Sequence, residues 1–168
     1  GGGGGGGGSA KLGADATFEE AYVAGDAELA LKKLRAQPAN SKQCFNVGMV
    51  HYSMRQYTEA IAAFNASLEK DSYMAVSYFQ RGTARMMAGD GALALDDFAK
   101  AAVMMRGHEF VDYGQMGLNF RLLKSDILFN QALAHSRTGA HQEAVDACAA
   151  AQRCEQLRDR LALKACAE

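Results

Sequence analysis

The sequence has 168 residues, with 18 lysines and arginines against 19 aspartates and glutamates, so its formal net charge is −1. This near balance argues against binding to nucleic acid or an anionic membrane through bulk charge. Hydrophobic residues make up 49% and charged residues 22%, with one proline and no tryptophan, which excludes a disordered chain and favours helices.

The chain opens with eight consecutive glycines. Because polyglycine behaves as a flexible coil, residues 1–10 are predicted to be a leader, whether a linker, an engineered tail or a low-complexity arm. The folded domain is expected to span residues 11–168. No secretory segment follows the leader, and no apolar run approaches the roughly 18 residues needed to cross a bilayer. We therefore expect a cytoplasmic protein that does not insert into membranes.

A pattern of small and aromatic residues recurs every 34 residues. Gly48, Ala60 and Phe64 recur as Gly82, Ala94 and Phe98. This spacing and order match the tetratricopeptide repeat, or TPR. A glycine inside a helix costs about 1 kcal/mol against alanine, so its use here indicates that two helices approach closely at that point.

Two further units flank these repeats. Ala132 and Ala144 continue the pattern downstream, with Cys148 at the aromatic position, whereas Ala30 and Leu34 mark a degenerate unit upstream. The predicted fold is an all-α TPR solenoid of four helical hairpins, with a capping helix at about 156–166. The expected helices span about 12–24 and 27–36, 42–54 and 57–70, 75–88 and 91–105, and 119–137 and 141–153.

The third and fourth repeats are separated by 16 additional residues, which place an insertion at about 105–118. Gly107, Gly114 and Gly117 interrupt helical periodicity, while Phe110, Val111 and Tyr113 prefer extended backbone. A short extended insertion is therefore expected here. Insertions in repeat proteins lie on one face, which is often the binding face.

The sequence offers little that would support catalysis. It lacks paired-cysteine zinc spacing, a phosphate-binding glycine loop and a Ser-His-Asp arrangement. We expect no catalytic, metal-binding or cofactor-binding residues, no cofactor, and a protein that is not an enzyme. The histidines at equivalent repeat positions, His51 and His135, are expected to pack. Reduced thiols are expected at Cys44, Cys148, Cys154 and Cys166.

Three segments carry a more specific resemblance: 75–82 (AVSYFQRG), 106–113 (RGHEFVDY) and 118–122 (LNFRL). Over roughly residues 12–165, the chain resembles the N-terminal TPR domain of the cytosolic activator subunits of phagocyte-type NADPH oxidases, the NADPH oxidase activator family. Four repeats and an insertion at the same junction are shared. The resemblance is weakest in the first repeat.

The resemblance implies binding to the GTP-loaded form of a Rac-type small GTPase, as a regulatory part of a superoxide-producing NADPH oxidase. Other oxidase subunits would be further partners, and recruitment to the membrane would occur through partners. The partner-binding residues implied by the resemblance come from the insertion and from the loops before the second and third repeats. They are Arg106, His108, Phe110, Asp112, Ser41, Asp71 and Tyr73.

The family usually has asparagine at His108, leucine at Phe110 and histidine at Tyr73. In the family, a segment after the TPR domain stimulates electron transfer from NADPH to flavin. Because this sequence stops at Glu168, we expect Rac binding without activation by this chain alone.

Two alternatives remain open. The chain would also suit a generic TPR adaptor that holds an extended peptide, such as a chaperone tail, in its concave groove. Asn46 and Asn130 share one repeat position, with Gln80 between them, and the nearest basic residues are Lys42, Arg81 and Arg85. A structural module that dimerises through its C-terminal helix is the third possibility.

Overall fold

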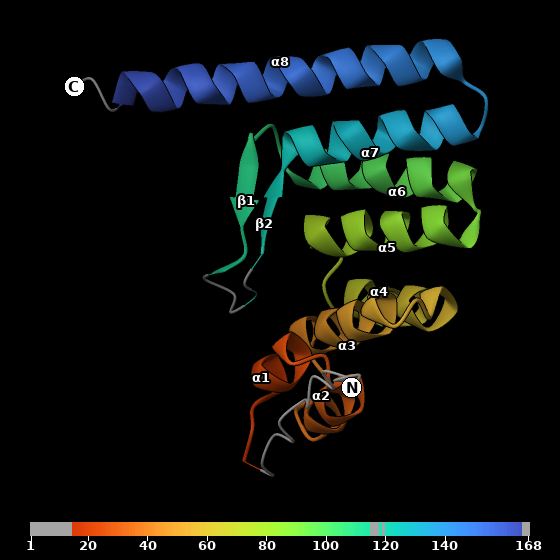
Figure 1. Cartoon of the computed structure of the whole chain (residues 1–168), viewed down its shortest axis with the longest axis vertical. Helices are drawn as coiled ribbons and strands as arrows, with labels where there is room; N and C mark the ends of the chain where they lie inside the picture. The colour runs from red at the N-terminus through yellow and green to blue at the C-terminus, as the bar shows by residue number, and fades with distance from the viewer. Residues whose placement is uncertain (1–14, 115–117, 119, 166–168) are drawn as a thin grey trace, which may run out of the picture.

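The computed structural model describes residues 15–114, 118 and 120–165. The predicted leader at 1–10 and Cys166 lie outside the described residues. Within the described part, eight helices form four antiparallel hairpins that stack into an elongated solenoid (Figure 1). The helices are α1 Phe18–Val23, α2 Ala27–Arg35, α3 Ser41–Ser53, α4 Tyr57–Lys70, α5 Ala75–Ala88, α6 Gly91–Met104, α7 Lys124–Arg137 and α8 His141–Ala165. The predicted all-α TPR solenoid is confirmed.

The repeated glycines permit the close helix contacts expected of them. A Cβ added to Gly48 would lie 2.5 Å from the ring of Phe64, and one added to Gly82 would lie 2.7 Å from the ring of Phe98. Both rings are fully buried, as are Ala60 and its counterpart one repeat later. The helices within these two hairpins therefore approach as closely as they do because no side chain stands at the glycine positions.

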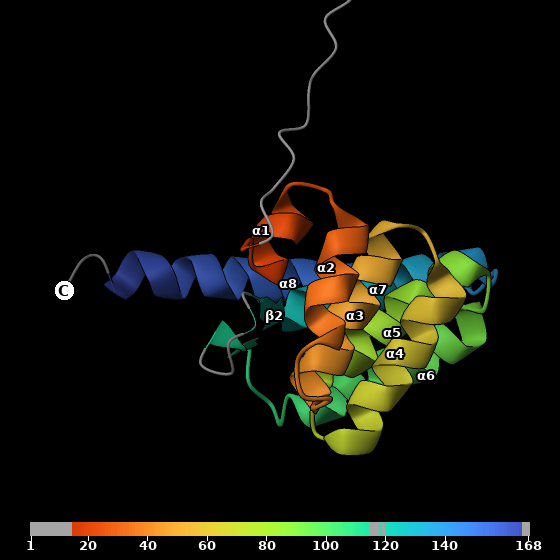
Figure 2. The ribbon, with the colours of Figure 1, turned by 90° about the horizontal axis from the view of Figure 1, so that it is seen from below.

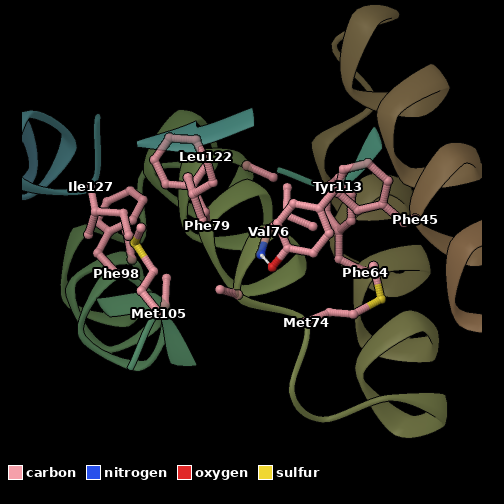
Figure 3. Close-up of a cluster of buried hydrophobic side chains, with 14 of the residues drawn as sticks. Phe45, Phe64, Met74, Val76, Phe79, Phe98, Met105, Tyr113, Leu122 and Ile127 are labelled. Carbon is pink, nitrogen blue, oxygen red and sulfur yellow. Dashed lines mark hydrogen bonds between the residues drawn. The ribbon is translucent and has the colours of Figure 1, made fainter. Parts of the chain in front are cut away.

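The hydrophobic core has two parts. The larger cluster runs from α3 to α7 and takes in Tyr113, Leu118 and Leu122 of the insertion (Figure 3). A smaller cluster holds the degenerate first hairpin against α3 through Ala21, Leu34 and Val50. The insertion is therefore part of the main core and not a loop laid over its surface.

Two helices begin later than the sequence suggested. The first was expected from about residue 12, but α1 begins at Phe18 because Thr17 and Glu20 form a capping box at its start. The seventh was expected from about 119, but α7 begins at Lys124. The residues before it, Arg121–Leu123, form strand β2 instead, and the carboxylate of Asp126 accepts a hydrogen bond from the Leu123 N–H at 3.3 Å.

The capping helix expected at about 156–166 is not a separate element. The last helix, α8, runs without a break for 25 residues from His141 to Ala165. Residues 152–156 contain neither glycine nor proline, so nothing in the backbone ends the helix there. The C-terminal part of α8 projects beyond α7 and the rest of the stack (Figures 1 and 2).

Candidate interaction surface

The insertion forms an antiparallel β-hairpin. Strand β1, Phe110–Asp112, pairs with strand β2, Arg121–Leu123, with Val111 opposite Leu122 in the register. At the open end, the Lys124 N–H donates to the carbonyl of Glu109 at 2.9 Å. The side chains of the same two residues form an exposed ion pair at 3.1 Å, and this carboxylate raises the pKa of Lys124. Residues 110–123, with these two strands at their ends, are called the insertion hairpin below.

The chain leaves α6 through two successive left-handed residues. Arg106 has a φ of 52° and Gly107 a φ of 82°. The His108 N–H closes this turn by donating to the carbonyl of Met105 at 3.0 Å. Left-handed backbone is unfavourable for an arginine, by about 1 kcal/mol or more, so this conformation depends on the structure around it. The turn directs the chain from the end of α6 into β1.

Arg106 contacts the loop before the third repeat. Its guanidinium lies 5.6 Å from the centre of the Tyr73 ring, which is 68% exposed. The loop itself is braced, because the carboxylate of Asp71 accepts a hydrogen bond from the Tyr73 N–H at 3.0 Å. Three predicted site residues from segments more than 30 positions apart are thereby brought to one place.

Ser41 is joined to the same region through a chain of buried hydroxyls. It is the first residue of α3, and its carbonyl accepts a hydrogen bond from Ser67 Oγ at 2.9 Å. Ser67 Oγ also lies 2.9 Å from Ser77 Oγ in the first turn of α5. Since a carbonyl can only accept, Ser67 donates to Ser41, which leaves Ser77 to donate to Ser67. The start of α3 is thus connected to the start of α5, and Ser41, predicted in the loop before the second repeat, lies in the first turn of that helix.

The outer face of the insertion hairpin presents Phe110 and Asp112. Phe110 is 49% exposed, and the guanidinium of Arg121 lies 5.0 Å from its ring centre. Arg121 Nη2 also pairs with Asp112 Oδ2 at 3.0 Å, while the Gly114 N–H donates to the other carboxylate oxygen at 2.8 Å. These hydrogen bonds, that of Gly114 first, lower the pKa of Asp112.

The structure therefore brings Arg106, Tyr73 and Asp71 together and connects Ser41 to them, whereas Phe110 and Asp112 lie on the insertion hairpin with Arg121 as their shared contact. Arg106 does not pair with Asp112, whose partners are Arg121 and Gly114. His108 is exposed in the turn before β1. The name edge surface is used below for the seven residues predicted from the sequence: Ser41, Asp71, Tyr73, Arg106, His108, Phe110 and Asp112.

Two residues that matter for this surface were not among the predicted partner-binding residues. Arg121 supports both Phe110 and Asp112, and buried Tyr113 connects the hairpin to α5. The alternation of Phe120, Arg121 and Leu122 is typical of a strand with one buried face, and it would have indicated β2. No local signal marks Tyr113 as a contact of α5, because its partner lies 37 residues away.

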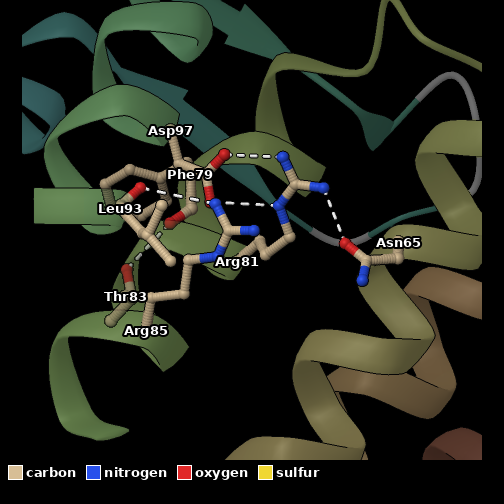
Figure 4. A network of polar contacts seen from close by, with 7 residues as sticks. All are labelled: Asn65, Phe79, Arg81, Thr83, Arg85, Leu93 and Asp97. Atoms are coloured by element: carbon tan, nitrogen blue, oxygen red, sulfur yellow. Dashed lines mark hydrogen bonds and ion pairs between the residues drawn. The ribbon is translucent and has the colours of Figure 1, made fainter. Parts of the chain in front are cut away.

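The arginines considered for a peptide clamp are held inside the third repeat. The side chain of Asp97 is fully buried, and it accepts hydrogen bonds from Arg81 Nη2 at 2.6 Å and from Arg85 Nη1 at 2.8 Å (Figure 4). Arg81 Nη1 also donates to Asn65 Oδ1 at 2.7 Å. These arginines complete a network inside the hairpin and between repeats, which leaves them poorly placed to serve a ligand.

Two apolar depressions lie along the first helices of the repeats. One of about 510 Å³ is bordered by α1, α3 and the insertion hairpin, with Asn46 among its lining residues. Another of about 500 Å³ lies between α5 and α7 and includes Gln80 and Asn130. The insertion hairpin reaches both, because Phe120 lines each of them.

The described residues contain no cluster of three or more His, Cys, Asp or Glu side chains that would hold a metal ion. Within that same part of the chain, no helix combines the length and the apolar character needed to cross a bilayer. Cys44, Cys148 and Cys154 are free thiols.

Comparison with known proteins gives the relatives of the chain. It is 38% identical to NADPH oxidase activator of Dictyostelium discoideum over 122 residues, which are 72% of this chain and 20% of that protein. It is 35% identical to human neutrophil cytosol factor 2 over 101 residues, 60% of this chain and 19% of that protein. The chain is homologous to these proteins. The resemblance inferred from the sequence is confirmed.

The same homology extends to NADPH oxidase activator 1 of Rattus norvegicus, at 34% identity over 63% of this chain and 24% of that protein. The chain thus spans about a fifth to a quarter of the length of these relatives, whose names are those of activators and of a cytosol factor. No protein-family model matches it.

Solved structures agree on the fold. The crystal structure of MamA superposes with a TM-score of 0.70 at 15% identity, covering 85% of this chain and 77% of that one. Another MamA structure gives a TM-score of 0.63 at 20% identity, covering 86% and 83%. At these identities the likeness concerns the fold alone, and it agrees with a helical solenoid of the TPR type.

Proposed function

We propose that the chain binds the GTP-loaded form of a Rac-type small GTPase through the edge surface, as a regulatory part of a superoxide-producing NADPH oxidase. The observation that supports this most is the contact between Arg106 and Tyr73. It joins the insertion to an inter-repeat loop, so that side chains from both face one partner. Other oxidase subunits are the further partners that the names of the relatives suggest.

The chemistry of the edge surface suits a protein partner. Arginine and tyrosine are enriched among the residues that dominate binding energies, and Phe110 adds an exposed apolar side chain on the insertion hairpin. The charged groups, Asp71, Arg106 and Asp112, are few and local, which agrees with the net charge of −1. Discrimination between the GTP and GDP forms would come from the switch segments of the GTPase, which are ordered by the γ-phosphate.

The test is an affinity measurement with Rac loaded with a non-hydrolysable GTP analogue or with GDP. Only the GTP-analogue form is expected to bind, and Arg106→Glu is expected to weaken binding by about 30-fold or more, the effect of losing a hot-spot residue. The control is Arg137→Glu, which reverses an exposed charge in the last turn of α7. Equal binding of both nucleotide forms, or no effect of Arg106→Glu, would contradict the proposal.

The alternative is a TPR adaptor that binds an extended peptide. It is favoured by the two depressions, where Asn46, Gln80 and Asn130 present amides along the first helices. The engagement of Arg81 and Arg85 by Asp97 counts against a clamp for a peptide carboxylate. Chaperone C-terminal peptides would bind under this alternative with an affinity that Arg106→Glu leaves unchanged.

A further inference from the structure

The start of α5 lacks a cap from its own sequence. The N-cap residue is Met74, whose side chain makes no capping hydrogen bond. The first N–H groups of a helix have no partner within the helix and need one from elsewhere when they are buried. At this helix the missing partner comes from the insertion hairpin, because the Val76 N–H donates to the hydroxyl of Tyr113 at 3.2 Å.

Tyr113 is firmly placed to make this contact. Its ring is 4% exposed and points toward the start of α5, beside Phe45, Phe64 and Met74 (Figure 3). Its backbone belongs to the insertion hairpin: the Tyr113 N–H donates to the carbonyl of Phe120 at 3.0 Å, and its own carbonyl accepts from Leu118 at 3.1 Å. One residue therefore belongs to the hairpin through its backbone and to α5 through its side chain.

The first turn of α5 is also where the other loops meet. The loop that carries Asp71 and Tyr73 runs directly into Met74, and the Ser67–Ser77 hydroxyl pair connects Ser41 to the same turn. A contact that joins the insertion hairpin to this turn therefore sets the position of the hairpin relative to both neighbouring loops.

We propose that Tyr113 is the positioning residue of the edge surface: its buried hydroxyl caps α5 and holds the insertion hairpin so that Arg106 and Phe110 are presented beside Tyr73. This inference rests on the proposed function, since it explains how that surface is assembled before a partner arrives. Binding to a surface that is already ordered avoids the entropy of ordering it, and the benefit appears as affinity.

The test compares Tyr113→Phe, which removes only the hydroxyl, with the matched control Tyr78→Phe on α5. In the free protein, hydrogen exchange of the Val76 amide is expected to become about tenfold faster in Tyr113→Phe and to stay unchanged in Tyr78→Phe, as the loss of one buried hydrogen bond implies. Affinity for the GTP-analogue form of Rac is expected to fall by about five- to tenfold in Tyr113→Phe alone.

A stability control separates positioning from a general weakening of the fold. Leu31→Ala removes buried atoms of α2 from the smaller core cluster and touches neither depression that the insertion hairpin reaches, so it should leave affinity unchanged although it lowers stability. Unchanged Val76 exchange in Tyr113→Phe would overturn the inference, and so would unchanged affinity where the wild type binds. If the wild type does not bind Rac, the proposed function fails, and the exchange measurement decides the role of Tyr113 alone.

Discussion

The ring of Phe64 occupies the space that a Cβ on Gly48 would need, with only 2.5 Å between them. Gly48→Ala is therefore expected to destabilise the protein by about 2 kcal/mol, because the overpacking outweighs the gain of about 1 kcal/mol in helix propensity. Urea denaturation measures this change. Phe64→Leu should relieve the clash, so the double variant should be more stable than the sum of the two single effects predicts. If Gly48→Ala stabilises the protein, α3 and α4 are packed less tightly at Gly48 and Phe64 than described.

Removal of the Asp97 carboxylate is expected to lower the free energy of unfolding far more than removal of the Asp96 carboxylate. Asp97→Ala leaves two largely buried arginines without their common partner, which should lower the free energy of unfolding by about 3–5 kcal/mol. Asp96→Ala removes an exposed carboxylate from the same helix and should change the free energy of unfolding by about 0.5 kcal/mol or less. Thermal and chemical unfolding of both variants tests the difference; similar losses would contradict it.

Substitution of Phe110 tests whether its ring anchors a partner or packs on its own hairpin. Its ring is half exposed, so Phe110→Ala should cost less than about 1 kcal/mol of stability but weaken binding of the GTP-analogue form of Rac by about tenfold or more. Val103→Ala, at an exposed position of α6 close to the insertion, is the control and should preserve binding. A variant at Phe110 that loses stability but keeps full affinity would assign the ring to packing on its own hairpin.

We expect the stability of the insertion hairpin at acid pH to depend on the protonation of Asp112. Hydrogen bonds from Gly114 and Arg121 lower its pKa below the ordinary 3.8, so the folded state binds the proton more weakly than the unfolded state. The carboxylate therefore contributes its stabilisation above about pH 4, and this contribution is lost as the pH falls through the folded-state pKa. Asp112→Asn should remove this acid transition from the hairpin signals in an NMR titration. A transition that persists unchanged in Asp112→Asn would exclude this assignment.

The repeats could be predicted from the sequence because each position has one dominant physical requirement. A small residue is needed where helices approach, and Gly48, Ala60 and their counterparts in the third repeat satisfy it in register. The helix bounds in the second and third repeats agree with the prediction to within one residue. Local periodicity and spacing were sufficient there, because each repeat packs mainly against its neighbours.

The insertion was harder to predict because its structure depends on distant contacts. Extended backbone was expected around Phe110 and Val111, and it is present, but β2 lies where a helix was predicted. The pairing of Arg121 with Asp112 follows from the hairpin register, and the contact of Tyr113 with Val76 depends on the packing of the whole third repeat. Neither is encoded in a short window of sequence.

The exposure of the edge surface has a consequence for how selectivity can change. Tyr73, His108 and Phe110 project outward and belong to neither core cluster, whereas the residues that assemble the surface, such as Tyr113 and Ser67, are buried behind them. Under the proposed function, single substitutions at the three exposed positions would alter partner choice at little cost to folding. The repeats would then provide a constant scaffold, on which affinity for a partner changes one exposed side chain at a time.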